Sequence, residues 1–119
     1  MSSIYEYRAK VIRVIDGDTL ALAVDLGCDV TLNLTVRLYG VNCPEMKGDT
    51  RVQGGMARHY TSNWLQEHAS ATQFTQQVTL KTHKDKREKF GRYLADIYAD
   101  GRHLNADLVE AGHAARYEP

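Results

Sequence analysis

The feature that most constrains the fold of this chain is the alternation of apolar and polar residues through its first forty positions. Residues 8–15 are rich in β-branched side chains, and residues 19–26 and 30–39 resume the alternation after breaks at Asp16-Gly17 and Gly27-Cys28-Asp29. A period of two predicts half-buried strands, and Asp-Gly and Gly-containing breaks predict tight turns. The sequence therefore predicts a meander of three antiparallel strands.

A helix is predicted next, beginning near residue 50. Thr50-x-x-Gln53 resembles a capping box, in which two side chains bond the first free backbone N–H groups of a helix. Apolar residues follow at four-residue spacing, which predicts a stripe that faces the core: Val52, Met56, Tyr60 and Trp64, with Ala57 and Leu65 beside them. Gly54 and Gly55 each cost a helix about 1 kcal/mol relative to alanine, so we expect the first turn of this helix to have low stability.

The second half of the chain predicts two further strands and a short helix. Residues 76–82 and 92–98 are the strands, and residues 105–111 are the helix, with Asn105 as a possible N-cap and Gly112 as its stop signal. Five strands with a helix between the third and fourth predict a mainly β, α+β fold, the OB-fold barrel, closed by a short C-terminal helix. OB-folds commonly bind oligonucleotides.

Length and composition are those of an ordinary globular chain. At 119 residues we expect one domain over residues 1–119, with 43% hydrophobic and 25% charged residues. No stretch is apolar enough for a membrane span, and the first residues do not form a signal-peptide pattern. We therefore expect a cytoplasmic protein with no membrane partner, and export after removal of a leader stays open as an alternative.

Charge is balanced overall but not locally. Fifteen basic and fifteen acidic residues cancel, whereas six of the twelve residues from 81 to 92 are basic and two are acidic. Such a stretch produces a positive field that would attract a phosphate backbone. A solvated basic loop explains the same pattern, and taken alone this stretch favours that reading slightly.

Polar residues stand at the ends of three predicted strands. Asp18 directly precedes the second strand, and Arg37 lies inside an apolar one. Pro44 then stiffens a corner that carries Asn42 and Glu45, whose oxygens suit a hard cation such as Ca²⁺. Ordinary turn chemistry also accounts for the Asp-Gly-Asp run, and an Arg37 pointing to solvent needs no function.

Taken together, these motifs resemble those of the staphylococcal nuclease family. The resemblance rests on Asp-Gly-Asp-Thr, Arg-x-x-x-Val-x-x-Pro-Glu, Lys-(aromatic)-Gly-Arg, Ile-Tyr-Ala-Asp-Gly and Leu-Val-x-x-Gly-x-Ala, in the family order, over about residues 7–114. It implies an OB-fold barrel that uses Ca²⁺ to hydrolyse DNA and RNA, leaving 3′-phosphates.

By motif position, the resemblance also implies individual roles. Asp18 matches a calcium-ligating aspartate, and Asn42 stands where the family has a second one. Cys43 matches a residue that ligates through its backbone carbonyl. Glu45 matches the proposed general base, and the two phosphate-binding arginines correspond to Arg37 and Arg92.

Nucleic acid is expected to contact a further set of residues: Lys84, Lys89, Phe90 and Tyr117. Phe90 replaces a tyrosine of the family, so it keeps a face for stacking and loses a hydroxyl. Tyr117 is expected to stack on a base, with a frayed chain end as the alternative. Asn42 departs from the family because it lacks the negative charge of aspartate. This predicts weaker or altered cation binding unless Asp16 or Asp49 compensates, with Mg²⁺ or Mn²⁺ as alternatives to Ca²⁺.

The sequence thus predicts a metal-dependent nuclease of low sequence specificity that acts as a monomer and prefers single-stranded DNA or RNA. The principal alternative is a non-catalytic OB-fold that binds nucleic acid, which Asn42 favours. A structural barrel without a nucleic-acid role is the third reading, and it leaves Glu45 and the two arginines unexplained.

Overall fold

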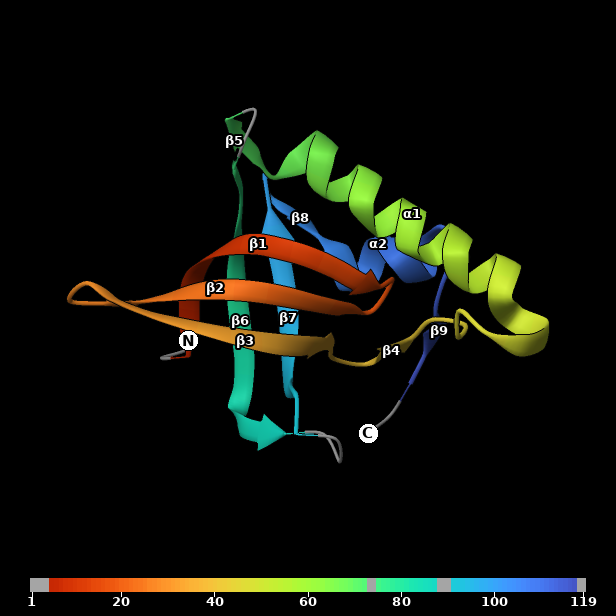
Figure 1. Ribbon diagram of the computed structural model, residues 1–119, viewed down its shortest axis with the longest axis horizontal. Coiled ribbons are helices and arrows are strands. Elements are labelled where there is room, and N and C mark those ends of the chain that lie inside the picture. The colour runs from red at the N-terminus through yellow and green to blue at the C-terminus, as the bar shows by residue number, and fades with distance from the viewer. Residues whose placement is uncertain (1–4, 73–74, 88–90, 118–119) are drawn as a thin grey trace.

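Five long strands close into a barrel: β1 (Glu6–Asp16), β2 (Thr19–Gly27), β3 (Val30–Leu38), β6 (Thr75–Arg87) and β7 (Tyr93–Ala99). β2 pairs antiparallel with β1 and β3, and β6 pairs antiparallel with β1 and β7. A parallel pairing of β3 with β7 completes the ring (Figure 1). This confirms the predicted OB-type barrel. The computed structural model describes residues 5–72, 75–87 and 91–117, with the backbone alone for residues 70–72 and 84–87.

Shorter elements surround the barrel. β4 (Val41–Asn42) pairs with β9 (Ala115–Arg116), β5 (Ser70–Thr72) with β6, and β8 (Arg102–His103) with β7. A 3₁₀ turn, η1 (Gly48–Thr50), leads into α1 (Arg51–His68), and α2 (Leu104–Glu110) follows β8. In Figure 1, α1 runs along the outside of the molecule, with α2 and the barrel on its inner side. In the described ranges, no helix is long and apolar enough to cross a membrane.

The core fills the barrel and continues beneath both helices. Buried side chains alternate with more exposed ones over residues 20–24 of β2, 36–38 of β3 and 95–99 of β7, as the period of two predicts. The fully buried side chains include Leu20, Leu22, Val24, Val36, Leu38, Leu80, Ile97, Leu65, Leu104 and Leu108. Because α1 and α2 contribute Leu65, Leu104 and Leu108, each helix is anchored by apolar burial against the sheet.

The face that α1 buries differs from the predicted stripe. Val52 is 67% exposed and Met56 is 54% exposed, and Tyr60 is partly buried. Of the predicted stripe, Ala57, Trp64 and Leu65 belong to the buried face, which Gly54 and Thr61 complete. The helix turns its small residues inward because it lies close to the β1–β2 turn, where Thr61 Oγ1 donates a 2.7 Å hydrogen bond to the Gly17 carbonyl.

Two predicted helix caps are also wrong. Thr50 precedes α1, but its hydroxyl caps no helical N–H and instead donates to the carbonyl of Glu45 at 2.7 Å. Asn105 lies inside α2, where its side chain accepts from Ile97 N–H and donates to the carbonyls of Tyr39 and Ala95. Both polar side chains therefore tie their helices to other segments of the chain. Sequence pattern could not foresee these long-range partners.

Candidate functional site

Three chain segments meet at one end of the barrel and enclose a hollow of about 420 Å³. They are the β1–β2 turn, the corner that follows β4, and the start of β7. The residues that line the hollow are Asp16, Asp18, Thr19, Asn42, Cys43, Pro44, Glu45, Met46, Lys47 and Arg92. Gly17 allows the turn to lie against α1, because a Cβ at Gly17 would fall 2.9 Å from the Cβ of Ala57 and 3.0 Å from the sulfur of Cys43.

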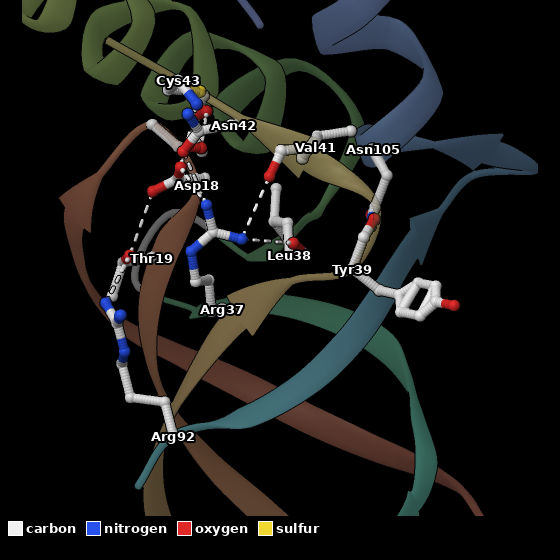
Figure 2. A network of polar contacts seen from close by, with 12 residues as sticks. Asp18, Thr19, Arg37, Leu38, Tyr39, Val41, Asn42, Cys43, Arg92 and Asn105 are labelled. Atoms are coloured by element: carbon white, nitrogen blue, oxygen red, sulfur yellow. Dashed lines mark hydrogen bonds and ion pairs between the residues drawn. The ribbon is translucent and has the colours of Figure 1, made fainter. Parts of the chain in front are cut away.

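Asp18 is the most enclosed carboxylate of the site. It is 7% exposed, and its Oδ2 accepts a 2.9 Å hydrogen bond from the backbone N–H of Cys43. Its Oδ1 accepts from the hydroxyl of Thr19 at 3.1 Å, and Arg37 Nη2 lies 3.5 Å from Oδ2 (Figure 2). A buried carboxylate is tolerated when donors surround it in this way. Asp18 thus connects the β1–β2 turn to the corner that follows β4.

Arg37 is held by acceptors of the protein itself. Nη1 donates to the carbonyls of Val41 and Leu38 at 3.0 and 3.3 Å, and Nη2 donates to Asn42 Oδ1 at 2.7 Å. Its side chain is 14% exposed, and the ring of Tyr117 lies 5.6 Å from the guanidinium carbon. The guanidinium therefore fixes the shape of the corner and brings positive charge beneath the hollow. The reading in which Arg37 merely points to solvent is wrong.

Arg92 reaches the hollow from the start of β7. Its Nη1 donates to Thr19 Oγ1 at 3.3 Å, so Thr19 connects Arg92 to Asp18 (Figure 2). Its positive charge also acts on Asp16 at the opposite end of the turn. Both predicted arginines therefore lie near Asp18, Arg37 from β3 and Arg92, through Thr19, from the segment before β7.

Glu45 combines a fixed backbone with an accessible carboxylate. Thr50 donates to its carbonyl, and Gly54 of α1 packs directly against it, since a Cβ there would lie 2.5 Å from the Glu45 oxygen. The carboxylate itself is 74% exposed and lies 3.9 Å from Lys47 Nζ. Such a group is positioned at the rim of the hollow and free to meet a ligand from solvent.

Negative charge is crowded in the hollow. Burial and the nearby carboxylate of Asp18 raise the pKa of Asp16, with a smaller contribution from Glu45, and the charges of Arg92 and Arg58 oppose this only partly. Burial also raises the pKa of the Cys43 thiol to about 12, so the thiol stays neutral near pH 7. A neutral thiol is a poor metal ligand, which leaves the backbone carbonyl as the ligand that Cys43 could offer.

Some predicted residues fall outside this description. Lys89 and Phe90 lie outside the described residues, and for Lys84 the structure gives only a place on β6. Tyr117 is half exposed, directly after β9, and its N–H donates to the Gly40 carbonyl at 2.8 Å. Its ordered place against Arg37 contrasts with the frayed end considered as an alternative.

Sequence reasoning missed several residues that line the hollow, among them Thr19 and Lys47. Thr19 connects Asp18 to Arg92, and Lys47 lies beside Glu45. Asp16, expected as a turn residue or as an acid that compensates for Asn42, lies among the site's charges. Asp16 and Thr19 both belong to the Asp-Gly-Asp-Thr motif, so the sequence contained a pattern that could have identified them as site residues. Lys47 follows Glu45 by two positions without any distinctive pattern.

The fold and site define a small OB-type barrel with acids and arginines gathered at one end. A family model described as "Staphylococcal nuclease homologue" matches residues 35–119. The chain is 32% identical over 117 residues to a thermonuclease of Staphylococcus hyicus, covering 96% of this chain and 62% of that protein. It is 37% identical over 110 residues to a thermonuclease of Staphylococcus intermedius, covering 90% and 58%. The chain belongs to the staphylococcal nuclease family.

A further relative is a protein of Escherichia coli O157:H7 named as an uncharacterized endonuclease. It is 28% identical over 114 residues, covering 95% of this chain and 63% of that protein. The chain thus spans about three-fifths of the length of these relatives.

Proposed function

We propose that this chain is a metal-dependent nuclease that hydrolyses phosphodiester bonds of DNA or RNA with little sequence preference. The observation that carries the proposal is the shared hollow, which Arg92 lines together with the carboxylates of Asp16, Asp18 and Glu45. Cleavage of a phosphodiester requires positive charge for the phosphoryl oxygens and a group that accepts a proton from water. The names of the relatives, thermonuclease and endonuclease, support the same activity.

The oxygen donors of the hollow suit a hard divalent cation, for which Ca²⁺ is the first choice and Mg²⁺ or Mn²⁺ the alternatives. The ligands would be the Asp18 carboxylate, the Asn42 amide oxygen and the Cys43 carbonyl. The carboxylates of Asp16, Asp18 and Glu45 line the same hollow, which supports this because neighbouring carboxylates favour a bound positive charge. Such a cation would supply Lewis-acid polarisation of a phosphoryl oxygen.

No three His, Cys, Asp or Glu side chains among the described residues form a ready-made metal-binding group. The proposed ligand set contains one carboxylate, with amide and carbonyl oxygens supplying the rest. Asn42 Oδ1 also accepts a hydrogen bond from Arg37, which competes with a cation for that oxygen. Modest cation affinity is therefore part of the proposal.

In the proposed reaction, the exposed carboxylate of Glu45 orients the attacking water and accepts its proton. Arg92 donates hydrogen bonds to the phosphoryl oxygens, which gain negative charge in the transition state. Arg37 joins it when Nη2 exchanges the oxygen of Asn42 for one of the phosphate. Bases of a single strand would stack on Tyr117 and Phe90, with Lys84 and Lys89 attracting the backbone. Attack of the water oxygen on phosphorus would break the bond to the 5′-oxygen, which would take a proton from solvent, so the products would carry a 3′-phosphate and a 5′-hydroxyl.

The experiment measures cleavage of fluorescent single-stranded DNA and RNA oligonucleotides with EDTA, Ca²⁺, Mg²⁺ or Mn²⁺. We expect cation-dependent products that end in 3′-phosphate. Glu45→Gln should lower turnover by about 10²–10⁴-fold, the usual contribution of a general base. Glu110→Gln is the matched control, because it makes the same chemical change on an exposed residue at the end of α2. Equal turnover in the two folded variants would remove Glu45 from the reaction.

The alternative function, binding of nucleic acid without cleavage, has one observation in its favour. Asn42 supplies no charge for a cation, and its oxygen is engaged by Arg37 at 2.7 Å. Salt-dependent binding without cleavage, in a folded protein saturated with each cation in turn, would establish this alternative. If the folded protein neither bound nor cleaved DNA or RNA, the barrel would have no nucleic-acid role.

A further inference from the structure

Thr19 is the buried polar residue on which two charged groups of the hollow converge. It is 2% exposed, begins β2 and lines the hollow. Its hydroxyl donates to Asp18 Oδ1 at 3.1 Å and accepts from Arg92 Nη1 at 3.3 Å (Figure 2). A hydroxyl has one hydrogen, so a hydroxyl that donates to Asp18 can meet Arg92 only as an acceptor. The two hydrogen bonds therefore run in one direction, from guanidinium to hydroxyl to carboxylate.

The sheet fixes the position of this hydroxyl. Thr19 pairs with Asp16 of β1 and with Arg37 of β3, so its backbone is held from both sides. Its side chain is β-branched, which restricts rotation about the first torsion angle. Arg92, in contrast, reaches the hollow through a long side chain from the segment before β7. Because such a side chain has many rotamers, an acceptor with a fixed position limits where its guanidinium lies.

The same hydroxyl decides how Asp18 can meet a further ligand. Oδ2 already accepts from the backbone N–H of Cys43 at 2.9 Å and lies 3.5 Å from Arg37 Nη2. Among the residues that the structure describes, Thr19 is the one donor to Oδ1. A carboxylate oxygen offers two lone-pair sites, so Oδ1 keeps one for a ligand. Thr19 thus orients the carboxylate and holds Arg92 next to the oxygen that has this capacity.

We propose that Thr19 is a positioning residue of the nuclease site. In the proposed function, on which this inference rests, Asp18 holds the cation and Arg92 binds the phosphoryl oxygens. The hydroxyl of Thr19 keeps the guanidinium beside the carboxylate before the substrate arrives, so the two groups need not be brought together during the reaction. Charge that is preorganised in this way stabilises the transition state, and a misplacement of about 1 Å can lower a rate about 10²-fold.

Thr19→Val tests this role, because it removes the hydroxyl and keeps a branched side chain that suits a strand. With the cation that the wild type requires, kcat for single-stranded DNA should fall about 10–100-fold and KM should change less than about threefold, since the guanidinium acts mainly in the transition state. Unchanged kcat in the folded variant would overturn the proposal.

Thr19→Ser supplies the rescue. It restores the hydroxyl, so kcat should return to within about threefold of the wild type. It also deletes a buried methyl group, so its urea midpoint should fall although its activity is kept. Retained activity in the less stable variant separates the hydroxyl from the stability of the fold. A serine variant as slow as the valine variant would contradict the role of the hydroxyl.

Thr61→Val is the matched control. Thr61 is also fully buried, and its hydroxyl donates to the carbonyl of Gly17 in the same β1–β2 turn at 2.7 Å. That hydrogen bond involves neither Asp18 nor Arg92. The control should lower the urea midpoint, while the folded protein keeps kcat within about threefold of the wild type. A loss of kcat as large as that of Thr19→Val would assign the effect to the turn as a whole and overturn the proposal.

A double-mutant cycle tests the connection from Thr19 to Arg92. Arg92→Lys keeps a positive charge and removes the guanidinium that the hydroxyl positions. In that background, Thr19→Val should therefore lower kcat less than about threefold further, because residues that act as a unit are not additive. A full loss in both backgrounds would show that Thr19 does not act through Arg92.

A measurement without substrate separates this inference from the proposed function. In NMR spectra recorded with EDTA, the guanidinium signal of Arg92 is assigned by its loss in Arg92→Lys. It should shift in Thr19→Val, return towards its wild-type position in Thr19→Ser and change little in Thr61→Val. No shift in Thr19→Val would overturn the contact, whether or not the protein cleaves nucleic acid. Absence of cleavage by the wild type would instead reject the proposed function, and with it the catalytic role of Thr19, even if the signal shifts.

Discussion

Replacing Gly54 by alanine tests how α1 holds the corner that carries Glu45. A Cβ at Gly54 would lie 2.5 Å from the Glu45 carbonyl oxygen, 2.6 Å from its carbon and 2.8 Å from Met46 N. All three are backbone atoms, so no flexible side chain can move aside. Either α1 or the Glu45–Met46 segment must shift.

The neighbouring glycine supplies the matched control. A Cβ at Gly55 would meet nothing within 4 Å. Both substitutions gain the same intrinsic helix propensity, about 1 kcal/mol. Their difference in unfolding free energy therefore isolates the steric cost at Gly54, which for overpacking of this kind is about 1–3 kcal/mol. We expect Gly55→Ala to stabilise the protein and Gly54→Ala to fall below it by that amount.

The assay is urea denaturation followed by circular dichroism, together with cleavage activity under native conditions. Measurements at two protein concentrations separate folding from association. Activity should fall in Gly54→Ala beyond the loss of folded protein, because the displaced backbone carries Glu45. Equal stability and equal activity in the two variants would refute the reasoning that Gly54 sets the position of the corner.

Further predictions concern protonation, thiols and the cation. Burial of Asp107 is outweighed by the hydrogen bonds that it accepts from Trp64 and Arg102, which lower its pKa from 3.8. Its ionised form therefore stabilises the fold fully above about pH 5, and this stabilisation is lost as the pH falls below the pKa of Asp107 in the unfolded chain. In acid titrations of the unfolding free energy, Asp107→Asn should flatten this loss. With a thiol reagent at pH 8, the exposed Cys28 should react quickly, and the buried Cys43, whose pKa is raised to about 12, should react only after unfolding; fast reaction of both thiols in the folded state would contradict the burial of Cys43. Asn42→Asp should tighten Ca²⁺ binding, measured by calorimetry, because it restores a charged ligand; unchanged affinity would show that Asn42 is not a ligand. Asp16→Asn should raise the stability of the cation-free protein at pH 7, with urea midpoints as the measurement.

Sequence pattern predicted the barrel well because each strand carries its own signal. Alternation marks the faces of β1, β2 and β3, and each predicted motif lies at a strand end. The closed ring then brings Asp18, Arg37 and Arg92 together. Local information was sufficient wherever backbone pairing alone determined the position of a residue.

Contacts between segments distant in sequence were not predictable in this way. The rotation of α1 depends on what lies beneath it, so the stripe through Val52 and Met56 was assigned to the core although it faces outward. Gly54 and Gly55 look alike in sequence, and only the Glu45 carbonyl distinguishes them. The acceptors of Arg37 likewise come from a corner whose shape no periodicity describes.

The electrostatics of Asp16 connect stability with the proposed activity. A carboxyl group whose pKa is raised by folding binds its proton more tightly in the folded state, so at neutral pH its ionisation opposes folding. Asparagine would fill the same turn position without that penalty. The penalty arises from burial and from the carboxylates of Asp18 and Glu45, which line the same hollow. A cation bound in the hollow would turn this penalty into a stabilisation, because the negative charge of Asp16 that repels the other carboxylates attracts a cation. The stabilisation predicted for Asp16→Asn should therefore shrink as Ca²⁺ is added, and a gain independent of Ca²⁺ would separate Asp16 from the cation site.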